Sequence, residues 1–161
     1  MDLRTERTKR SITNAFLELR KQKSIEKITV KELSELAYIN KATFYTHYHD
    51  IYDLSDQLEN EFMDSIIQEM PHPESIITDP ALATRELADM LIEKMDITNI
   101  LFSGSRQNML SEKIYIALMK YISSNYPEQE SSLKRDIVLS IIIQGCFHAY
   151  QIFANDGNRD E

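Results

Sequence analysis

The chain places apolar residues at helical spacing over most of its length. In the first such segment Ile12, Ala15, Phe16 and Leu19 fall at i, i+3, i+4 and i+7, the spacing of one helix face. The same pattern predicts helices over about 5–22, 30–37, 41–47, 51–70, 80–95, 107–125 and 132–154. The 161 residues include three glycines and four prolines, too few for the many turns of an all-β fold. We therefore predict an all-α fold.

Capping residues indicate where the short helices of the N-terminal part begin. Thr29-Val30-Lys31-Glu32 has the pattern of a capping box, in which the threonine hydroxyl and the glutamate carboxylate accept hydrogen bonds from the first N–H groups of a helix. Asn40 and Asp50 are placed to cap the two helices that follow. Two short helices joined by a tight turn predict a helix-turn-helix. Residues 71–79, which contain Pro71 and Pro73, are the predicted linker.

The charge of the chain changes sign along its length. Residues 1–49 hold ten Lys/Arg and six Asp/Glu, a balance of +4, whereas residues 50–161 carry −12, and the whole chain carries −8. This asymmetry favours a basic segment that faces a polyanion and an acidic body that does not. Two solvated surfaces of different charge are the alternative, and the charge alone leaves both open.

Several classes of protein and site find no support in the sequence. The N-terminus lacks the apolar core of a signal peptide and no apolar run is long enough for a membrane span, so we expect a cytoplasmic protein without membrane contact. The single cysteine, Cys146, is expected to be a buried small hydrophobe. His47, His49 and Asp50 fit helix-boundary or DNA-facing roles better than a metal site. No nucleophile, base and oxyanion hole come together, so we predict neither an enzyme nor a cofactor.

A longer motif resembles a known family. Thr29-Val30-Lys31-Glu32-Leu33-Ser34-Glu35-Leu36-Ala37, followed by Asn40-Lys41-Ala42-Thr43-Phe44-Tyr45-Thr46-His47-Tyr48, is similar to the helix-turn-helix signature of TetR-family transcriptional regulators. The resemblance covers about residues 5–58, and its most specific part is the Thr-Phe-Tyr-x-His-Tyr core with Leu54 beyond it. It implies a three-helix, homeodomain-like DNA-binding domain over 1–50. A long fourth helix would join this domain to a helical domain for dimerisation and ligand binding over 51–161.

In functional terms the resemblance implies a repressor that binds a near-palindromic operator in double-stranded DNA as a homodimer and is released by a small-molecule effector. A protein with the same fold that acts through protein partners, as a coactivator or adaptor with weak or no DNA binding, is the alternative. Two departures bear on this choice. Tyr38 stands where the family usually has the glycine of the turn, so the turn either has a different backbone conformation or holds a non-glycine residue at some strain. Ile51 stands where the family commonly has a lysine that touches phosphate. His49 or the N–H groups at the start of the fourth helix would have to replace that lysine.

A recognition helix presents polar or small side chains to the groove from one face and packs its apolar face on its own domain. Phe44 and Tyr48, at i and i+4, are the predicted buried face. By resemblance, the residues expected at base edges are Lys41, Ala42 and Thr46, and those expected nearer the phosphates are Thr29, Thr43, Tyr45, His47 and His49. Arg4 and Arg7, at the start of the first helix, are placed to reach a phosphate strand or the adjacent minor groove. Intradomain packing is the alternative for Tyr45 and His47, and an ordinary solvated helix end is the alternative for the arginines.

The C-terminal part matches the family in helical character alone. By resemblance, its last two helices pair with their copies, and we predict an interface that includes Ile137, Ile141, Gln144, Gly145, His148 and Ile152. A ligand pocket would be lined by Met90, Met95, Phe102, Tyr115, Met119, Phe147 and Tyr150, which could equally fill a core. Gly145 either permits close helix approach or is a tolerated core glycine.

Overall fold

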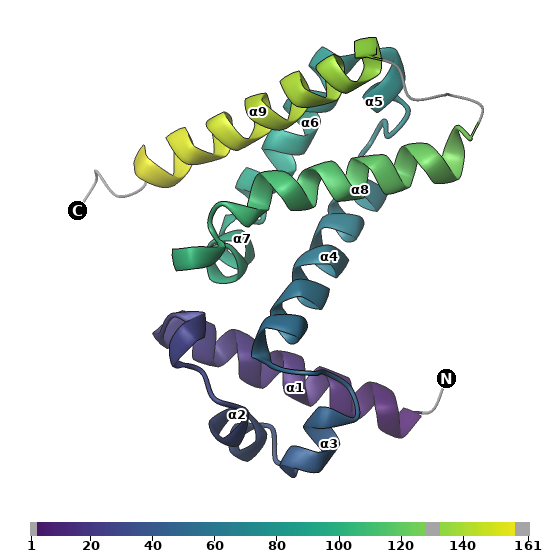
Figure 1. Ribbon diagram of the computed structural model, residues 1–161. Helices are drawn as coiled ribbons and strands as arrows, with labels where there is room; N and C mark the ends of the chain where they lie inside the picture. Colours follow the sequence, from purple (N-terminus) through teal and green to yellow (C-terminus); the bar gives the residue numbers. More distant parts are fainter. Residues whose placement is uncertain (1–2, 128–132, 157–161) are drawn as a thin grey trace. The chain divides into compact units, whose positions relative to one another are not determined.

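The computed structural model describes residues 3–127 and 133–156, with the side chains of 153–156 left aside. Over these residues the regular structure is entirely helical, which confirms the all-α prediction (Figure 1). The α-helices are α1 Leu3–Gln22, α2 Val30–Leu36, α3 Lys41–Tyr45, α4 Ile51–Glu69, α5 Ser75–Thr78, α6 Pro80–Glu93, α7 Met95–Leu101, α8 Met109–Asn125 and α9 Leu133–Asp156. None of the helices in the described ranges has the length and hydropathy needed to cross a membrane.

The chain folds as two compact units. Unit 1 comprises Met1–Glu59 and Asn99–Gln107, and unit 2 comprises Asn60–Thr98 and Asn108–Glu161. Unit 1 therefore extends beyond residue 50, where we expected the first domain to end, and recruits a short segment from much later in the chain.

Two arginines hold the later segment in unit 1. Arg106 donates from Nε to Glu59 at 2.8 Å and from Nη2 to Asp56 at 2.9 Å. Arg20 of α1 donates from Nη2 to the Ser103 hydroxyl at 2.7 Å. Both guanidinium groups thus tie residues 99–107 to the N-terminal helices. These contacts join residues 47 to 83 positions apart, so no local pattern could have indicated them.

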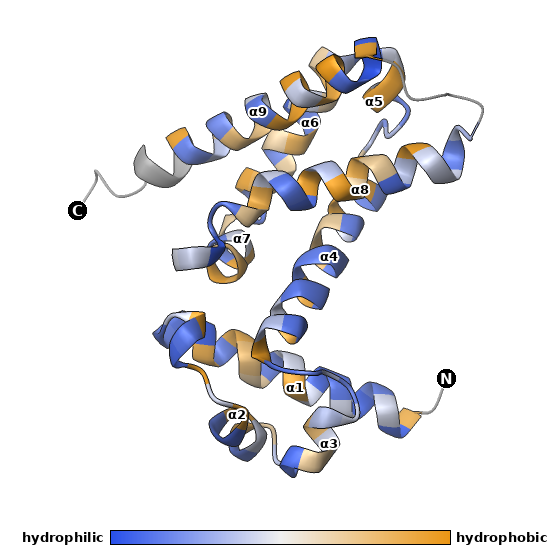
Figure 2. Ribbon diagram, viewed as in Figure 1, coloured by the Kyte–Doolittle hydropathy of each residue, from blue (hydrophilic) through white to orange (hydrophobic). Residues whose placement is uncertain are grey.

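Burial in unit 1 follows the predicted helix faces, and apolar and polar residues alternate along the helices (Figure 2). Ile12 and Phe16 of α1, Leu33 of α2, Phe44 of α3 and Leu54 of α4 are each 0% exposed. Burying one such side chain contributes roughly 1.5–3 kcal/mol, so this shared core, rather than the propensity of helices only five or seven residues long, stabilises α2 and α3.

Two helices were missed by the sequence prediction. The linker predicted over 71–79 contains α5, and the end predicted near 95 is followed directly by α7. Ile76 of α5 is 2% exposed and Leu101 of α7 is 1% exposed, so each short helix is stabilised by the burial of an apolar side chain. Pro71 and Pro73 precede α5 and are compatible with it, since proline restricts the residues before it and not those after.

The α4–α5 connection is anchored to α6 by a charged pair. The His72 Nδ1 atom lies 2.8 Å from Glu86 Oε1, and the His72 amide donates to Glu86 Oε2 at 3.2 Å. The hydrogen bond and the negative charge of Glu86 raise the pKa of His72 above its ordinary value. Protonation of His72 therefore strengthens the anchor.

In unit 2, α9 packs along α6 and buries one face of its helix. Leu139, Ile142 and Cys146 are at most 1% exposed, and the Cys146 thiol donates to the Thr84 carbonyl at 3.3 Å. Burial raises the pKa of Cys146 to about 12, so the thiolate is negligible at neutral pH. Cys146 is buried in the way we predicted for a small hydrophobe.

Gly145 allows α9 to approach α6 closely. A Cβ atom built on Gly145 would lie 2.8 Å from Cγ2 of Thr84, whose hydroxyl donates to the Pro80 carbonyl at 2.7 Å. The close approach that the sequence suggested is thus to a helix of the same chain, which separates Gly145 from the other residues predicted for a dimer interface.

The effect of Gly145→Ala on the free energy of unfolding is expected to depend on Thr84. Alanine gains about 1 kcal/mol over glycine in a helix interior, but overpacking costs about 1–3 kcal/mol, so Gly145→Ala is expected to be neutral or destabilising by up to about 2 kcal/mol. In a Thr84→Ser background, which removes Cγ2 and keeps the hydroxyl, the same substitution should stabilise by about 1 kcal/mol. Urea unfolding of the four proteins measures both values. An equal gain in both backgrounds would show that Thr84 moves aside freely.

Candidate nucleic-acid interface

The turn between α2 and α3 is a Schellman motif. Tyr38 has φ of 55°, its amide donates to the Glu35 carbonyl at 3.2 Å, and the Ile39 amide donates to the Ser34 carbonyl at 3.0 Å. These are the 5→2 and 6→1 bonds that end a helix at a residue in the left-handed conformation, where glycine is usual. Of the two alternatives for this turn, the structure adopts the second: the residue at the turn keeps the left-handed conformation, and a tyrosine occupies it at some strain.

Tyr38→Gly is expected to stabilise the chain. The left-handed conformation costs a non-glycine residue about 1–2 kcal/mol, glycine loses about 0.5–1 kcal/mol to chain entropy, and the net gain should be about 0.5–1 kcal/mol. The Tyr38 side chain is 95% exposed, so its removal loses little packing. Tyr38→Ala is the control, because it removes the ring and keeps the strain. Thermal unfolding should separate the two variants, and equal stabilisation by both would exclude backbone strain as the cause.

N-caps fix the beginnings of α2 and α3, as predicted. The Thr29 hydroxyl accepts from the Glu32 amide at 3.2 Å, and Asn40 Oδ1 accepts from the Thr43 amide at 2.7 Å. The second half of the predicted capping box differs, because the Glu32 carboxylate accepts from Lys23 Nζ at 2.6 Å instead of returning to the helix start. Lys23, which precedes the box in sequence, competes successfully for that carboxylate.

The predicted recognition helix presents the side chains we expected on each face. Phe44 is 0% and Tyr48 5% exposed, which confirms the buried face, and Lys41, Ala42, Tyr45 and Thr46 are exposed. Thr43 and His47 are half-buried.

Hydrogen bonds and ring contacts within the chain already engage some groups of these side chains, which are then less available to a binding partner. The Thr43 hydroxyl donates to Asn40 Oδ1 at 2.9 Å, and the Thr46 hydroxyl donates to the Thr43 carbonyl at 2.7 Å. The rings of Tyr45 and Phe44 meet edge to face with centroids 5.5 Å apart, and the rings of His47 and Tyr48 lie 6.3 Å apart. Tyr45 and His47 therefore take part in intradomain packing, and Tyr45 remains 56% exposed.

The start of α4 differs from a simple phosphate-binding helix end. Asp50 Oδ1 accepts from the Asp53 amide at 2.8 Å, and Asp53 Oδ2 accepts from the His49 amide at 2.8 Å. Hydrogen bonds from Gln57 and from the His49 amide lower the pKa of Asp53, so this carboxyl is ionised at neutral pH. The Asp50-x-x-Asp53 spacing is the sequence signal that could have indicated this reciprocal cap. Two carboxylates here disfavour a phosphate and leave the exposed His49 side chain as the remaining candidate.

Ile51 contributes to the core and not to the surface. It is 6% exposed, so the position where the family commonly has a lysine is buried in this chain. The other predicted phosphate contacts, Thr29, Arg4 and Arg7, are exposed in unit 1.

The residues predicted to line a ligand pocket differ in burial and belong to both units. Met90, Phe102 and Tyr150 are buried, Met95, Met119 and Phe147 are half-buried, and Tyr115 is 44% exposed. Phe102 belongs to unit 1, whereas the other six belong to unit 2. The clefts described below are lined by other residues.

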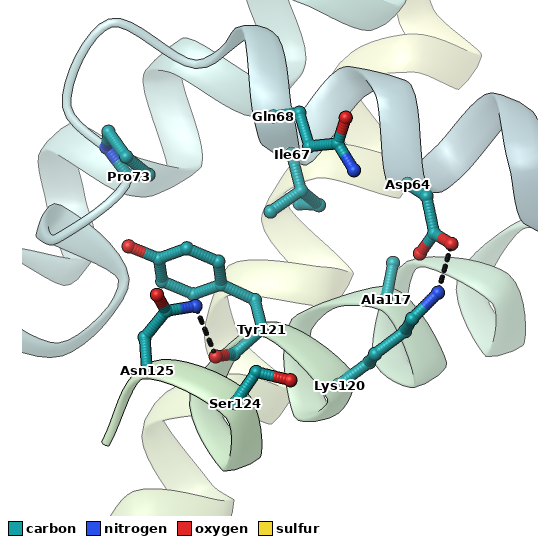
Figure 3. Close-up of a pocket in the computed structure, with 9 residues that line it drawn as sticks. All are labelled: Asp64, Ile67, Gln68, Pro73, Ala117, Lys120, Tyr121, Ser124 and Asn125. Carbon is teal, nitrogen blue, oxygen red and sulfur yellow. Dashed lines mark hydrogen bonds and ion pairs between the residues drawn. The ribbon is translucent and has the colours of Figure 1, made fainter.

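One cleft of unit 2, of about 450 Å³, lies between α4, Pro73 and α8 (Figure 3). Asp64 of α4 and Lys120 of α8 both line it and form an ion pair, and Tyr121 of α8 also lines it. Burial raises the pKa of the Tyr121 phenol. The remaining polar groups, from Gln68, Ser124 and Asn125, are neutral. Because its two charges neutralise each other, this cleft has no net charge with which to select an ionic ligand.

The residues predicted for the dimer interface, Gly145 excepted, form an exposed stripe along α9. Ile137 is 51%, Ile141 63% and Ile152 49% exposed, and Gln144 and His148 are also exposed. A shallow groove on the same helix is lined by Leu133, Asp136, Ile137, Ser140, Ile141 and Gln144. Ser140, Gln144 and His148 of α9 thus face outward and not into an internal pocket.

In the ranges that the structure describes, no three His, Cys, Asp or Glu side chains are placed to hold a metal ion together.

No protein-family model matches the chain, and a search of the curated proteins found no match. The resemblance to TetR-family regulators therefore rests on the residues of the helix-turn-helix motif.

Proposed function

We propose that the chain is a TetR-type transcriptional regulator, a repressor that binds a near-palindromic DNA operator as a homodimer. The observation that carries this proposal is the helix α3, whose exposed side chains Lys41, Ala42 and Thr46 stand opposite a fully buried Phe44. A cap from Asn40 and the Schellman turn at Tyr38 fix the direction in which that helix leaves α2. A helix of this kind can enter the major groove with its first turns against base edges.

The hydrogen bonds of α3 refine the roles of its residues. The Lys41 ammonium can donate to guanine, the commonest specific contact of a lysine, and the Ala42 methyl can touch a thymine methyl. Since the Thr46 hydroxyl already donates to the Thr43 carbonyl, its methyl and its oxygen lone pairs remain for the groove. Arg7, exposed on α1, would contact phosphate and carry no sequence information.

A salt-dependent electrophoretic shift assay with the DNA upstream of the protein's own gene tests the proposal. Lys41→Ala should lower the preference for the operator over scrambled DNA by about 1–3 kcal/mol. Arg7→Ala should weaken binding to both DNAs alike and lower the slope of log affinity against log salt by about one. Lys120→Ala, at an exposed lysine of α8, is the matched control and should leave both quantities unchanged. If Lys41→Ala and Arg7→Ala change both quantities equally, the assigned roles are wrong.

A coactivator or adaptor that acts through protein partners is the second candidate. The observation in its favour is the start of α4, where Ile51 is buried and Asp50 and Asp53 supply negative charge in place of a phosphate-binding lysine. This candidate predicts no salt-dependent shift with the upstream DNA. The balance of +4 over residues 1–49 and the exposed face of α3 favour the repressor. Release by an effector is the part of the family pattern with the least support, since it rests on the resemblance alone.

A further inference from the structure

We infer that unit 2 contains a pH-sensitive anchor, in which the charge of His72 sets how firmly the α4–α5 connection and α5 are held on α6. Both carboxylate oxygens of Glu86 take part: Oε1 lies 2.8 Å from His72 Nδ1, and Oε2 accepts from the His72 amide at 3.2 Å. The side chain of Glu86 is 11% exposed and that of His72 is 58% exposed. A largely buried carboxylate thus meets an imidazole that exchanges protons with water.

His72 also belongs to the turn that begins α5. Its carbonyl accepts from the Ser75 amide at 2.9 Å, and the Pro73 carbonyl accepts from the Ile76 amide at 3.3 Å. His72 therefore bonds to α6 through its ring and its amide, and to α5 through its carbonyl. A displacement of His72 away from Glu86 would carry the start of α5 with it.

The short helix α5 combines one favourable burial with unfavourable features. Ile76 is 2% exposed, which stabilises the helix on its unit. The helix is four residues long, and the side chain of its N-cap, Glu74, makes no capping hydrogen bond. The Ser75 hydroxyl is buried without a hydrogen-bond partner among the residues that the structure describes, which costs about 1–3 kcal/mol. The position of α5 therefore depends on contacts outside the helix, and the bond of His72 to Glu86 is one of them.

Protonation changes both the charge and the hydrogen bonding of His72. The imidazolium has a proton on each nitrogen, so Nδ1 always donates to Glu86, whereas the neutral ring has a proton on one nitrogen. The hydrogen bond to Glu86, the charge of Glu86 and the charge of Glu74 raise the pKa of His72. The neighbouring helices also carry charged or titratable side chains, which are Glu69 of α4, Arg85 and Asp89 of α6, Tyr121 of α8, and Lys134 and Arg135 of α9.

Acid should strengthen the anchor and base should weaken it. Because the pKa of His72 is higher in the folded than in the unfolded chain, its contribution is complete below about pH 6.5, the ordinary value, and is lost as the pH rises through the folded-state pKa. α5 supplies Ile76 and Ile77 to the wall of a cleft of about 390 Å³, which residues of α6, α8 and α9 complete. The anchor thus makes the wall of this cleft sensitive to pH.

An NMR titration of the full chain from about pH 5 to pH 8, the range in which histidine changes charge, tests the inference. The δ1 methyl signals of Ile76 and Ile77 should shift with the same midpoint as the His72 ring protons, and that of Ile137 should not. Amide protection in 75–79, corrected for the intrinsic exchange rate, should fall about threefold from pH 5 to pH 8. His72→Gln keeps a donor and cannot titrate, so it should abolish both changes. His148→Gln, at an exposed histidine of α9, is the matched control and should leave both unchanged.

Glu86→Gln, which removes the negative charge and keeps an acceptor, should lower the midpoint of His72. Methyl signals of Ile76 and Ile77 that do not follow His72, an unchanged midpoint in Glu86→Gln, or the same pH dependence in His72→Gln would each overturn the inference. The wild-type titration is decisive by itself if a variant fails to fold. The inference goes beyond the proposed function and does not depend on it. The titration contains no DNA, so its failure and the failure of operator binding are separate results.

Discussion

Replacing Arg106 by alanine is expected to destabilise unit 1 by about 3–5 kcal/mol, the effect of leaving a buried charge without its partner. Glu59 is 0% exposed and accepts from Arg106 Nε at 2.8 Å and from the Ser55 hydroxyl at 2.7 Å, while Arg106 Nη2 approaches the second carboxylate oxygen. Hydrogen bonds to Glu59 raise the pKa of Arg106, so the guanidinium stays charged at every accessible pH. In Arg106→Ala the Glu59 carboxylate keeps the Ser55 hydrogen bond and loses its hydrogen-bonded counter-charge, while Arg20, whose charge Glu59 also stabilises, stays as the more distant cation.

Urea unfolding of four variants separates this loss from the loss of the arginine side chain itself. Arg106→Lys keeps the charge but cannot donate two parallel bonds, so its stability should fall between wild type and Arg106→Ala. The double variant Arg106→Ala, Glu59→Gln should be more stable than Arg106→Ala, because the uncompensated charge is gone. Arg85→Ala, at an exposed arginine of α6, should change stability by less than about 0.5 kcal/mol. A loss below 1 kcal/mol in Arg106→Ala would mean that water reaches Glu59.

Arg106→Ala should also make local unfolding of residues 99–107 more frequent. This segment belongs to unit 1 through Arg106 and through Arg20, which is 4% exposed and donates to the Ser103 hydroxyl and carbonyl. Burial lowers the pKa of Arg20, which reflects the desolvation that these hydrogen bonds offset. With one of two anchors removed, hydrogen exchange in 99–107 should accelerate more than in α2.

Local signals predicted the elements of the candidate interface well. Spacing and capping residues lie within four positions of one another, so Thr29, Asn40 and the apolar pair Phe44 and Tyr48 could be assigned from the sequence. The sequence left two alternatives for the turn at Tyr38, and the φ angle of 55° decides between them. The interactions that escaped prediction are long-range: Arg106 with Glu59, 47 positions apart, and Thr84 with Cys146, 62 positions apart.

The size and apolar character of single residues predicted their burial less well than helical spacing did. The seven residues expected around a ligand were chosen because they are large and apolar, and the structure distributes them between two cores and the surface. One cleft of unit 2 is lined by residues of α5, α6, α8 and α9 and depends on α5, which the prolines of the preceding residues concealed. A cleft that forms where four separate segments meet has no signature in any one of them.

The exposed stripe of α9 leads to the prediction with the largest effect on assembly. Ile141 is 63% exposed, and Ile137 and Ile152 are about half exposed at helical spacing on the same face. Large apolar side chains gathered on one face commonly mark a protein interface. If that face meets its own copy across a two-fold axis, every substitution enters the interface twice. Ile141→Glu should then raise the dimer dissociation constant by a factor of about thirty or more, because two carboxylates lose their water.

Analytical ultracentrifugation and the operator shift assay together measure this effect. Ile141→Lys should dissociate the dimer as Ile141→Glu does, since both signs of charge repel their own copy, and Leu36→Glu, at an exposed apolar residue of α2, should leave it intact. Two half-sites one helical turn apart are bound together only by a dimer, so the monomeric variants should lose operator affinity while α3 is unchanged. A wild-type chain that is monomeric at micromolar concentration, or an Ile141→Glu variant that remains dimeric, would remove α9 as the interface. Operator binding by such a chain would then have to come from unit 1 alone.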